Sequence, residues 1–398
     1  MAKIRTIKVL LAGGGTGGHI YPLLAVAKEL GNLTSANGLG VDIRYFGDPL
    51  NYRDDLEGAG IHITKIATSK WRNYFDIQNI FDIFRFAWSL PQALVKIFFF
   101  MPDVCFTKGG PGALAIIYAC KFYFIPIVVH ESDTVPGRTN LKAAKKAKVI
   151  DLAFSEALSH FGKIIGTPHV VGNPVRSEIL AVRDKTKESQ RSYKIELGFD
   201  ADAPLLFISG GSQGAERLNT FVLEHFKELV LKFQILHQTG PRNFQSYDRE
   251  FRFLEKGIEE NLMQRYKYVP YLDPTKIAKA YAASDFLIAR AGSGTIFEAA
   301  ATGTPTLLVP LPESAKNHQF QNAYVYREKG AALLLEEDNF LVTVVINELE
   351  KILNNPDKLK AMQDAARGFF VEKSANLIAT DVLRVAQGIP VKNLDNSA

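Results

Sequence analysis

The stretch LAGGGTGGHIYPLLAVAKEL, residues 11–30, places five glycines and a histidine between two apolar segments. Residues 7–11 are apolar except for Lys8, which predicts a short buried strand. Residues 22–30 predict a helix with Pro22 in its first turn. The glycines allow a tight turn, and free N–H groups at the start of a helix favour an anion. The stretch therefore predicts a strand, a phosphate-binding loop and a helix, since a tight turn alone does not need five glycines.

The same arrangement recurs twice in the second half of the chain. It is found in LLFISGGSQGAERLN, residues 205–219, and in DFLIARAGSGTIFEAAATGTPTLLVP, residues 285–310. Three such loops favour a site for a pyrophosphate or for two phosphorylated substrates. No acidic cluster with metal-ligand spacing stands out in the sequence, so we expect phosphate binding without a metal.

The composition is that of a soluble globular protein, with 47% hydrophobic and 22% charged residues. The 398 residues suit two domains of about 200 residues each. An excess of 47 basic over 42 acidic residues is too small to indicate nucleic acid binding, but it is compatible with an anionic membrane surface. Cys105 and Cys120 lie in apolar contexts and are expected to be buried free thiols, as in a reducing cytoplasm. We expect no signal peptide, because Lys3 and Arg5 lead straight into the first predicted strand. We expect no membrane-spanning segment, because no apolar run reaches ~20 residues.

Short apolar runs alternate with helical stretches along the whole chain. The predicted strands lie near residues 7–12, 41–46, 61–66, 103–106, 126–130, 149–153, 204–208, 233–238, 265–269, 285–288, 305–309 and 331–335. This alternation predicts an α/β architecture with parallel sheets covered on both faces. The polar segment 181–204 is the expected linker. It gives two doubly wound domains, 1–185 and 186–398, with a ligand between them at the carboxyl ends of the strands.

A dinucleotide-dependent oxidoreductase is an alternative, because Gly13, Gly15 and Gly18 satisfy G-x-G-x-x-G. That motif expects an acidic residue about 20 residues further on, at the end of the second strand. Asp48 follows the second predicted strand but lies behind a long insertion. The two later glycine loops also have no role in such an enzyme, so this alternative is the weaker one.

Several motifs resemble those of the MurG family of glycosyltransferases. They are GGGTGGHIYP, HESDTVPGRTN, VVGNPVR, GGSQGAERLN and RAGSGTIFEAAATGTPTLLVP followed by NHQFQNA, in order from about residue 7 to residue 330. The resemblance implies the GT-B architecture of two Rossmann-like domains. It implies an inverting transfer of N-acetylglucosamine from UDP-N-acetylglucosamine to the muramyl 4-hydroxyl of lipid I, which forms lipid II in peptidoglycan synthesis. It further implies no cofactor, no active-site metal, and a peripheral location on the cytoplasmic face of the cell membrane.

The resemblance implies that His19 lies near the reacting centre. An imidazole can take the proton of the attacking acceptor hydroxyl at neutral pH, or it can hydrogen-bond a phosphate. Glu131 is the other candidate for the catalytic base. Gly15, His130 and Asp133 are the implied acceptor contacts, although many relatives carry Asn at the position of Asp133.

The resemblance also implies a donor site. Glu298 is expected to accept hydrogen bonds from the ribose hydroxyls, and Arg176 and Ser212 to contact the diphosphate. The backbone at Leu272 is expected to pair with the uracil edge, and Gln319 to bind sugar hydroxyls. The implied donor set is Thr16, Gly17, Gly18, Arg176, Ser212, Gln213, Leu272, Arg290, Gly292, Ser293, Glu298 and Gln319.

The segment KGGPGALA, residues 108–115, departs from the family. Pro111 stands where many relatives carry an aromatic residue after the paired glycines, which puts an acceptor contact from a ring in doubt. The resemblance also implies that the helices over about 339–387 return to the first domain. A relative with another UDP-sugar or another lipid acceptor, such as diacylglycerol, and a non-catalytic nucleotide-sugar binder are the other functions left open.

The segment NYFDIQNIFDIFRFAWSLPQALVKIFFFMPDV, residues 73–104, predicts a helix with a broad aromatic face. Pro91 is expected to break or restart this helix. We expect the helix to cover the first sheet and its outer residues to contact lipid, together with the lysines of LKAAKKAKVI, residues 141–150. A solvated helix face is the alternative. The aromatic face and its basic neighbours are Phe75, Ile80, Phe81, Phe84, Phe86, Trp88, Lys70, Arg72, Arg85 and Lys96.

Overall fold

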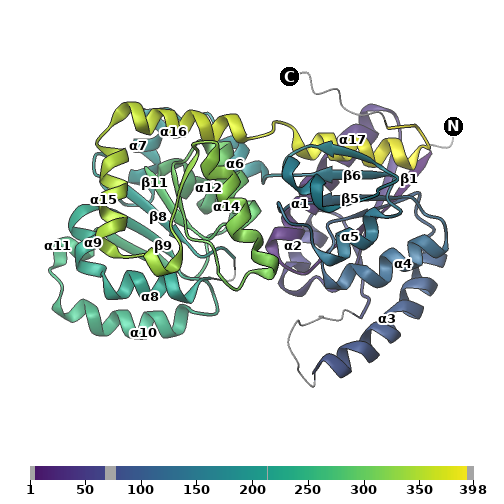
Figure 1. Ribbon diagram of the computed structural model, residues 1–398, viewed down its shortest axis with the longest axis horizontal. Helices are drawn as coiled ribbons and strands as arrows, with labels where there is room; N and C mark the ends of the chain where they lie inside the picture. Colours follow the sequence, from purple (N-terminus) through teal and green to yellow (C-terminus); the bar gives the residue numbers. More distant parts are fainter. Residues whose placement is uncertain (1–4, 68–77, 213, 392–398) are drawn as a thin grey trace. The chain divides into compact units, whose positions relative to one another are not determined.

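The computed structural model describes residues 5–67, 78–212 and 214–391. Its contacts divide the chain into two units, one of residues 1–174 with 371–398 and the other of residues 175–370. Each unit contains one parallel sheet covered by helices (Figure 1). This confirms the predicted α/β fold of two doubly wound domains.

The first unit is built on a seven-stranded parallel sheet in the order β3-β2-β1-β4-β5-β6-β7. Its strands are β1 (Thr6–Ala12), β2 (Gly40–Phe46), β3 (His62–Thr64), β4 (Val104–Thr107), β5 (Ile127–Glu131), β6 (Val149–Leu152) and β7 (Thr167–Val170). The order reverses between β1 and β4, and ligands of doubly wound sheets bind beyond the carboxyl ends of the strands at such a point. The sequence pattern predicts every strand of this sheet except β7.

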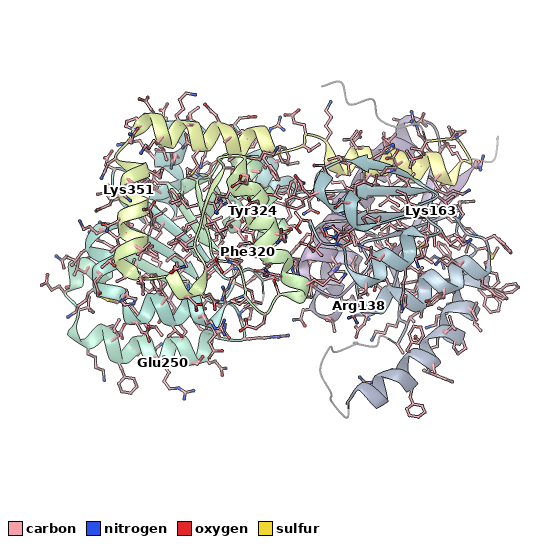
Figure 2. All side chains as sticks on the ribbon, in the orientation of Figure 1. Arg138, Lys163, Glu250, Phe320, Tyr324 and Lys351 are labelled. Atoms are coloured by element: carbon pink, nitrogen blue, oxygen red, sulfur yellow. The ribbon has the colours of Figure 1, made fainter. Side chains whose placement is uncertain are left out.

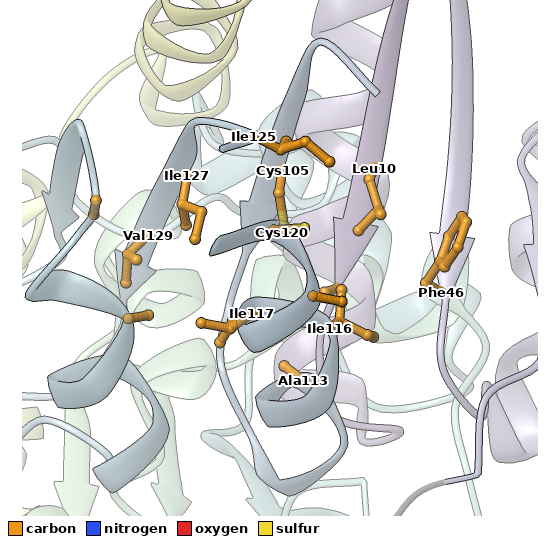
Figure 3. Packing of buried hydrophobic residues seen from close by; sticks show 14 of the residues in the cluster. Leu10, Phe46, Cys105, Ala113, Ile116, Ile117, Cys120, Ile125, Ile127 and Val129 are labelled. Carbon is orange, nitrogen blue, oxygen red and sulfur yellow. The ribbon is translucent and has the colours of Figure 1, made fainter. Parts of the chain in front are cut away.

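Apolar side chains fill the space between this sheet and the helices on each of its faces. The helices are α1 (Gly17–Ala36), α2 (Arg53–Gly58), α3 (Gln78–Phe100), α4 (Leu114–Phe122), α5 (Arg138–Ala144) and α17 (Ser374–Ala386). Ile116, Ile117 and Cys120 of α4 lie against Leu10 and Cys105 of the sheet (Figure 3). Both cysteines are buried free thiols, as predicted.

The second unit is built on a six-stranded parallel sheet in the order β10-β9-β8-β11-β12-β13. Its strands are β8 (Leu205–Ser209), β9 (Gln234–Gln238), β10 (Tyr266–Val269), β11 (Phe286–Ala289), β12 (Thr306–Leu308) and β13 (Ala332–Leu334). The strand order reverses between β8 and β11. All six strands lie where the sequence pattern predicts them.

The helices of the second unit cover both faces of its sheet. They are α6 (Ser177–Ala181), α7 (Lys187–Glu196), α8 (Glu216–Glu224), α9 (Phe226–Lys232), α10 (Phe244–Leu254), α11 (Glu260–Met263), α12 (Pro274–Ala283), α13 (Ser293–Thr302), α14 (His318–Glu328), α15 (Val342–Leu353) and α16 (Pro356–Phe369). Figure 2 shows Phe320 and Tyr324 on α14, where their rings stack with centroids 6.4 Å apart.

The boundary between the units lies between residues 174 and 175, not at 185/186 as expected. The expected linker, residues 181–204, contains α7. The Thr186 hydroxyl accepts the Ser189 N–H and the Ser189 hydroxyl accepts the Thr186 N–H, which starts this helix. The buried Lys194 ammonium of α7 lies 2.7 Å from the Asp285 carboxylate. Local capping and a buried ion pair therefore fold a segment whose polarity suggests a linker.

Two prolines lie inside helices rather than at their ends. α1 begins at Gly17, so Pro22 is within it and not in its first turn. α3 runs from Gln78 to Phe100 with Pro91 inside, which corrects the expectation that Pro91 breaks the helix. A proline removes only one helical hydrogen bond, and the packing of the flanking residues can compensate for it.

Of the helices over 339–387 that were expected to return to the first domain, only α17 belongs to the first unit, whereas α15 and α16 belong to the second. The helix α17 packs against α1, and Ile378, Val382 and Val385 join the core formed by β1, β4 and α1. The Asn376 amide donates to the Glu29 carboxylate at 3.0 Å.

Gly303 ends α13 in the left-handed conformation, with a φ of 59°. We predict that Gly303→Ala lowers the free energy of unfolding by about 1–2 kcal/mol, because an L-residue is strained there. A Cβ would also lie 2.7 Å from Nε of Arg367. Gly368→Ala is the matched control in the same unit. It lies in α16 with no atom within 4 Å of a new Cβ and should be neutral or stabilise by up to ~1 kcal/mol.

Urea unfolding followed by circular dichroism measures both variants. Equal stability of the two variants would contradict the role assigned to the left-handed helix end.

Candidate active site

Two loops meet where the strand order of the first unit reverses. One follows β1, and the other follows β4. The Lys108 N–H donates to the Ala12 carbonyl at 3.0 Å and ties the second loop to the end of β1. Gly110 has a φ of 86°, and a Cβ on it would lie 3.0 Å from the backbone nitrogen of Gly14. Glycine is therefore required at 110, and the two loops lie in direct backbone contact.

His19 is the third residue of α1 and stands beside this contact. Its Nδ1 lies 2.8 Å from Oγ1 of Thr16, the residue that precedes the helix. The Thr16 side chain makes no bond to a helix N–H, so its hydroxyl is used to hold the imidazole. The N–H groups of Gly17 and Gly18 in the first turn have no acceptor within the helix and can face an anion.

Lys108 is the buried cation of this region. Its Nζ donates to Nδ1 of His130 at 2.7 Å and to Oδ1 of Asn173 at 3.1 Å. Nε2 of His130 donates to the Gly172 carbonyl at 2.9 Å, which fixes the tautomer whose Nδ1 accepts. Burial lowers the pKa of Lys108 to about 7. Burial and the nearby Lys108 also lower the pKa of His19 to about 4, so its imidazole is neutral at pH 7.

Glu131, at the end of β5, organises the loop that follows it. Its carboxylate accepts the N–H groups of Asp133 and Gly137, each at 3.0 Å, and the amide of Asn140 at 2.9 Å. Burial and the Asp133 carboxylate raise the pKa of Glu131 to about 7. The side chain is buried and both of its oxygens are engaged, so it holds residues 131–140 in place.

The structure gathers the expected residues of the first unit at the carboxyl edge of its sheet. Thr16 and Gly18 are exposed, and His19 and Asp133 are half-buried, whereas His130 and Glu131 are inside the fold. Thr16, Gly18, His19 and Asp133 are therefore at least partly accessible to solvent, and His130 and Glu131 are not. The expected residues in this region are Gly15, Thr16, Gly17, Gly18, His19, His130, Glu131 and Asp133.

The second unit has the same kind of edge between β8 and β11. The loop after β8 contains Ser212 and leads to α8. The loop after β11 contains Gly292, which precedes α13, and Ser293, which begins it. Residues 292–295 are half-buried, so the first-turn N–H groups of α13 are accessible to an anion. Gln213, another expected donor contact, lies outside the described residues.

Arg176 and Glu298 form an ion pair in the second unit. Nε and the terminal nitrogen of the Arg176 guanidinium lie 2.8 and 2.7 Å from Oε1 of Glu298. Tyr281 is also hydrogen-bonded to Glu298 and is buried. The residue expected at the diphosphate, Arg176, therefore lies beside the residue expected at the ribose, Glu298, although Arg176 precedes α6 and Glu298 is in α13.

Arg290 is held inside the second unit. It donates to the carbonyls of Val309 and Pro310 at 3.1 and 3.3 Å, and it forms an ion pair with Glu337. Only 7% of its surface is exposed. The contacts fix the end of β11 against the segment after β12, so the geometry gives Arg290 a positioning role.

Gln238 ties two expected donor segments together. Its Oε1 accepts the Leu272 N–H at 3.0 Å, and its amide donates to the Gly211 carbonyl at 3.3 Å. The Leu272 N–H is thus used within the protein. Gln319, in the first turn of α14, accepts the Leu311 N–H at 3.0 Å and stays half-buried.

Sequence reasoning missed Lys108, Asn140 and Gln238. Each follows or packs against the end of a predicted strand, and Lys108 is a charge placed between an apolar strand and paired glycines. That placement is a usable signal for a buried charge at a sheet edge. Asn140 and Gln238 act through contacts between distant segments, which the sequence pattern does not contain.

Apolar rings lie exposed on α3, α4 and the turn after α4, and we call them the aromatic surface. Phe99 and Phe124 are 81% and 93% exposed. Phe86 instead packs against the core, Phe75 lies outside the described residues, and nothing is described for the side chains of Ile80 and Phe81. The aromatic surface consists of Phe84, Trp88, Phe98, Phe99, Phe122 and Phe124.

Lysines border the aromatic surface. Nζ of Lys121 donates to the Lys142 carbonyl at 3.0 Å and lies 5.6 Å from the centre of the Tyr118 ring. Burial, Lys146 and Lys145 lower the pKa of Lys121, which places the three ammonium groups within electrostatic range. Within the described residues, no helix is both long and apolar enough to cross a membrane.

Comparisons with known proteins agree with this geometry. Residues 9–150 match the glycosyltransferase family 28 N-terminal domain, and residues 205–378 match its C-terminal domain. The chain is 31% identical to the UDP-N-acetylglucosamine–N-acetylmuramyl-(pentapeptide) pyrophosphoryl-undecaprenol N-acetylglucosamine transferase of Thermoanaerobacter sp. (strain X514), over 91% of this chain and 95% of that protein. It is 33% identical to transferase 2 of the same name from Bacillus cereus, over 89% and 93% of the two chains.

Solved structures give the same result. The crystal structure of MurG from Acinetobacter baumannii matches with a TM-score of 0.69 and 25% identity, over 95% of this chain and 99% of that one. UDP-GlcNAc 2-epimerase from Neisseria meningitidis matches with a TM-score of 0.66 but 13% identity, which shows a shared fold alone. The chain therefore belongs to glycosyltransferase family 28, in the group of the MurG transferases.

Proposed function

We propose that this chain transfers N-acetylglucosamine from UDP-N-acetylglucosamine to the muramyl 4-hydroxyl of lipid I, with inversion at the sugar carbon. The observation that carries the proposal is the end-to-end similarity to transferases of that name, 31% over 91% of this chain. The geometry supports it, because each unit presents first-turn N–H groups beside charged side chains at the carboxyl edge of a parallel sheet.

The two units take different substrates in this proposal. The second unit binds the donor, with Glu298 at the ribose hydroxyls, Arg176 at the diphosphate, and Ser293 at the start of α13 beside them. The paired side chains support this division, since a diphosphate and a diol satisfy a guanidinium and a carboxylate respectively. The first unit binds the acceptor and supplies the base.

His19 is the base in this proposal. Its imidazole is half-buried, neutral at pH 7, and held by Thr16 beside accessible N–H groups. Removal of the acceptor hydroxyl proton needs an accessible lone pair. The Glu131 carboxylate offers no accessible lone pair, because the side chain is buried and already accepts three N–H groups of the protein. Glu131 is therefore a positioning residue.

The aromatic surface docks on the cytoplasmic face of the membrane in this proposal. A lipid-linked acceptor requires the enzyme to work at a bilayer. Exposed rings beside lysines are the combination that partitions into an anionic membrane interface. Peripheral binding through this surface brings the first unit to the acceptor.

His19→Ala should lower kcat at least ~100-fold while the donor Kd changes little, because proton removal is lost and donor binding is not. His160→Ala, an exposed histidine of the same unit, should leave kcat unchanged. Single-turnover transfer to a lipid I analogue and calorimetric titration with UDP measure the two quantities.

The pH profile separates the two candidate bases. With His19 as the base, kcat/KM falls only as the pH drops toward about 4, where the imidazole binds a proton. An acid limb near pH 7 that disappears in Glu131→Gln would identify Glu131 instead, whose pKa is raised to about 7.

Glu298→Ala should raise the Kd for UDP at least ~10-fold, since hydrogen bonds to a carboxylate contribute ~1.5–3 kcal/mol each. The loss should be smaller for 2′-deoxy-UDP, which lacks one of the two ribose hydroxyls that can donate to the carboxylate. Glu196→Ala removes a surface ion pair with Lys279 in the same unit and should leave the Kd unchanged. An equal loss of affinity for UDP and for 2′-deoxy-UDP would contradict the proposed contact between Glu298 and the ribose.

The double substitution Phe99→Ser with Phe124→Ser should weaken binding to vesicles at least ~10-fold, since one buried ring contributes ~1.5 kcal/mol or more. Lys145→Glu with Lys146→Glu should weaken binding only to vesicles that contain acidic lipid. Phe253→Ser, which removes a ring that is 73% exposed in the second unit, is the control. Undiminished co-sedimentation of the aromatic double variant would refute the docking surface.

A further inference from the structure

Three ionisable side chains meet inside the first unit, one strand away from His130, which is the register partner of Asp151 on β5. Asp151 lies on β6 and His169 on β7, and the two are register partners in neighbouring parallel strands. Their side chains therefore point to the same face of the sheet. Asp381 reaches them from α17, which covers that face (Figure 1).

The cluster is sealed from solvent. Asp151, His169 and Asp381 are 0%, 2% and 5% exposed. Val149 and Val171 flank the two strand residues on the same face, and Val382 follows Asp381. Carboxylates in such apolar surroundings need a compensating charge or hydrogen bonds, because burial of an isolated ion costs several kcal/mol.

Protein groups compensate only part of the negative charge of the two carboxylates. Nδ1 of His169 lies 2.6 Å from Oδ2 of Asp381. The Asp151 carboxyl lies against the Asp381 carboxyl, and neither of its oxygens accepts a hydrogen bond from an N–H or hydroxyl group among the described residues. One ligand atom from each of the three side chains lies within 4.8 Å of the other two. The Asp151 carboxyl thus faces an imidazole and a second carboxyl group.

We propose that Asp151, His169 and Asp381 bind a divalent transition cation, Zn²⁺ or Mn²⁺, that fastens α17 to the sheet of the first unit. One imidazole and two carboxylates are a suitable donor set for these ions. A neutral imidazole, two carboxylates and a divalent cation sum to zero charge, which suits the apolar surroundings. The cation would join residues that are 212 positions apart in the sequence.

The role is structural. α17 returns to the first unit after the whole second unit has intervened, so its docking closes a very long loop. A metal bound only in the folded state adds its binding free energy to the stability of that unit. The alternative is a proton shared between the two carboxyl groups, which would satisfy the same site without a metal.

The metal content of the full chain distinguishes a bound cation from a proton shared between the two carboxyl groups. The protein is produced without a metal-binding tag, refolded separately with Zn²⁺, Mn²⁺ or chelator, dialysed, and analysed by elemental mass spectrometry. We expect about one equivalent of Zn²⁺ or Mn²⁺ per chain and a Tm several degrees above that of the chelator-refolded protein. Substoichiometric metal and an unchanged Tm in both preparations would overturn the proposal in favour of the shared proton.

Variants locate the bound ion. Asp151→Asn should reduce occupancy at least ~10-fold, since loss even of an outer partner of a metal ligand costs that much. Asp42→Asn, which removes a surface ion pair with Arg44 in the same unit, should retain full occupancy. Equal metal content in Asp151→Asn and wild type would overturn the site. If Asp151→Asn does not fold, the visible absorption of the wild-type protein refolded with Co²⁺ reports whether side chains of the protein bind the metal.

Discussion

The close backbone contact between Gly110 and Gly14 is the constraint on which the candidate active site depends. It brings the loop after β4 against the loop after β1 at the point where the strand order reverses. Any side chain at 110 would separate the loops. Lys108 on one loop and His19, at the start of the helix that follows the other loop, then lie close enough for the lysine to lower the pKa of the imidazole. A steric requirement of the backbone thus becomes an electrostatic property of the site.

The buried polar groups of the first unit form a support for this contact. Lys108 is held by His130 and Asn173, which come from two other strand ends. Glu131 and Asn140 hold the loop after β5 in the same way. Because these groups are buried and hydrogen-bonded to one another, removing one leaves another unsatisfied, which costs more than the lost bond itself. The support is therefore rigid, and the exposed residues Thr16 and Gly18 at its surface are preorganised.

Sequence reasoning predicted twelve of the strands and the family, because apolar periodicity and glycine loops are local signals. It missed β7, whose residues TPHV are mixed in polarity and contain a proline. That strand is held by its pairing with β6 and by α17, neither of which is local. The same limit explains α7, whose buried Lys194 pairs with Asp285 from a distant segment. For the candidate site, the sequence located the loops but not which side chains would be buried, as His130, Glu131 and Arg290 are.

The ion pair of Arg176 with Glu298 bears on how the donor site selects its ligand. The two charges satisfy one another, at 2.7–2.8 Å and with little exposure. A ligand that offered only an anion would take Arg176 and leave Glu298 with its charge uncompensated in a poorly hydrated position, which is costly. A ligand that offered only a diol would meet a carboxylate already engaged. A nucleoside diphosphate offers both groups at once, so the pair can separate with each partner satisfied. On the proposed function, the pair acts as a filter that favours ligands in which a diphosphate and a ribose are joined.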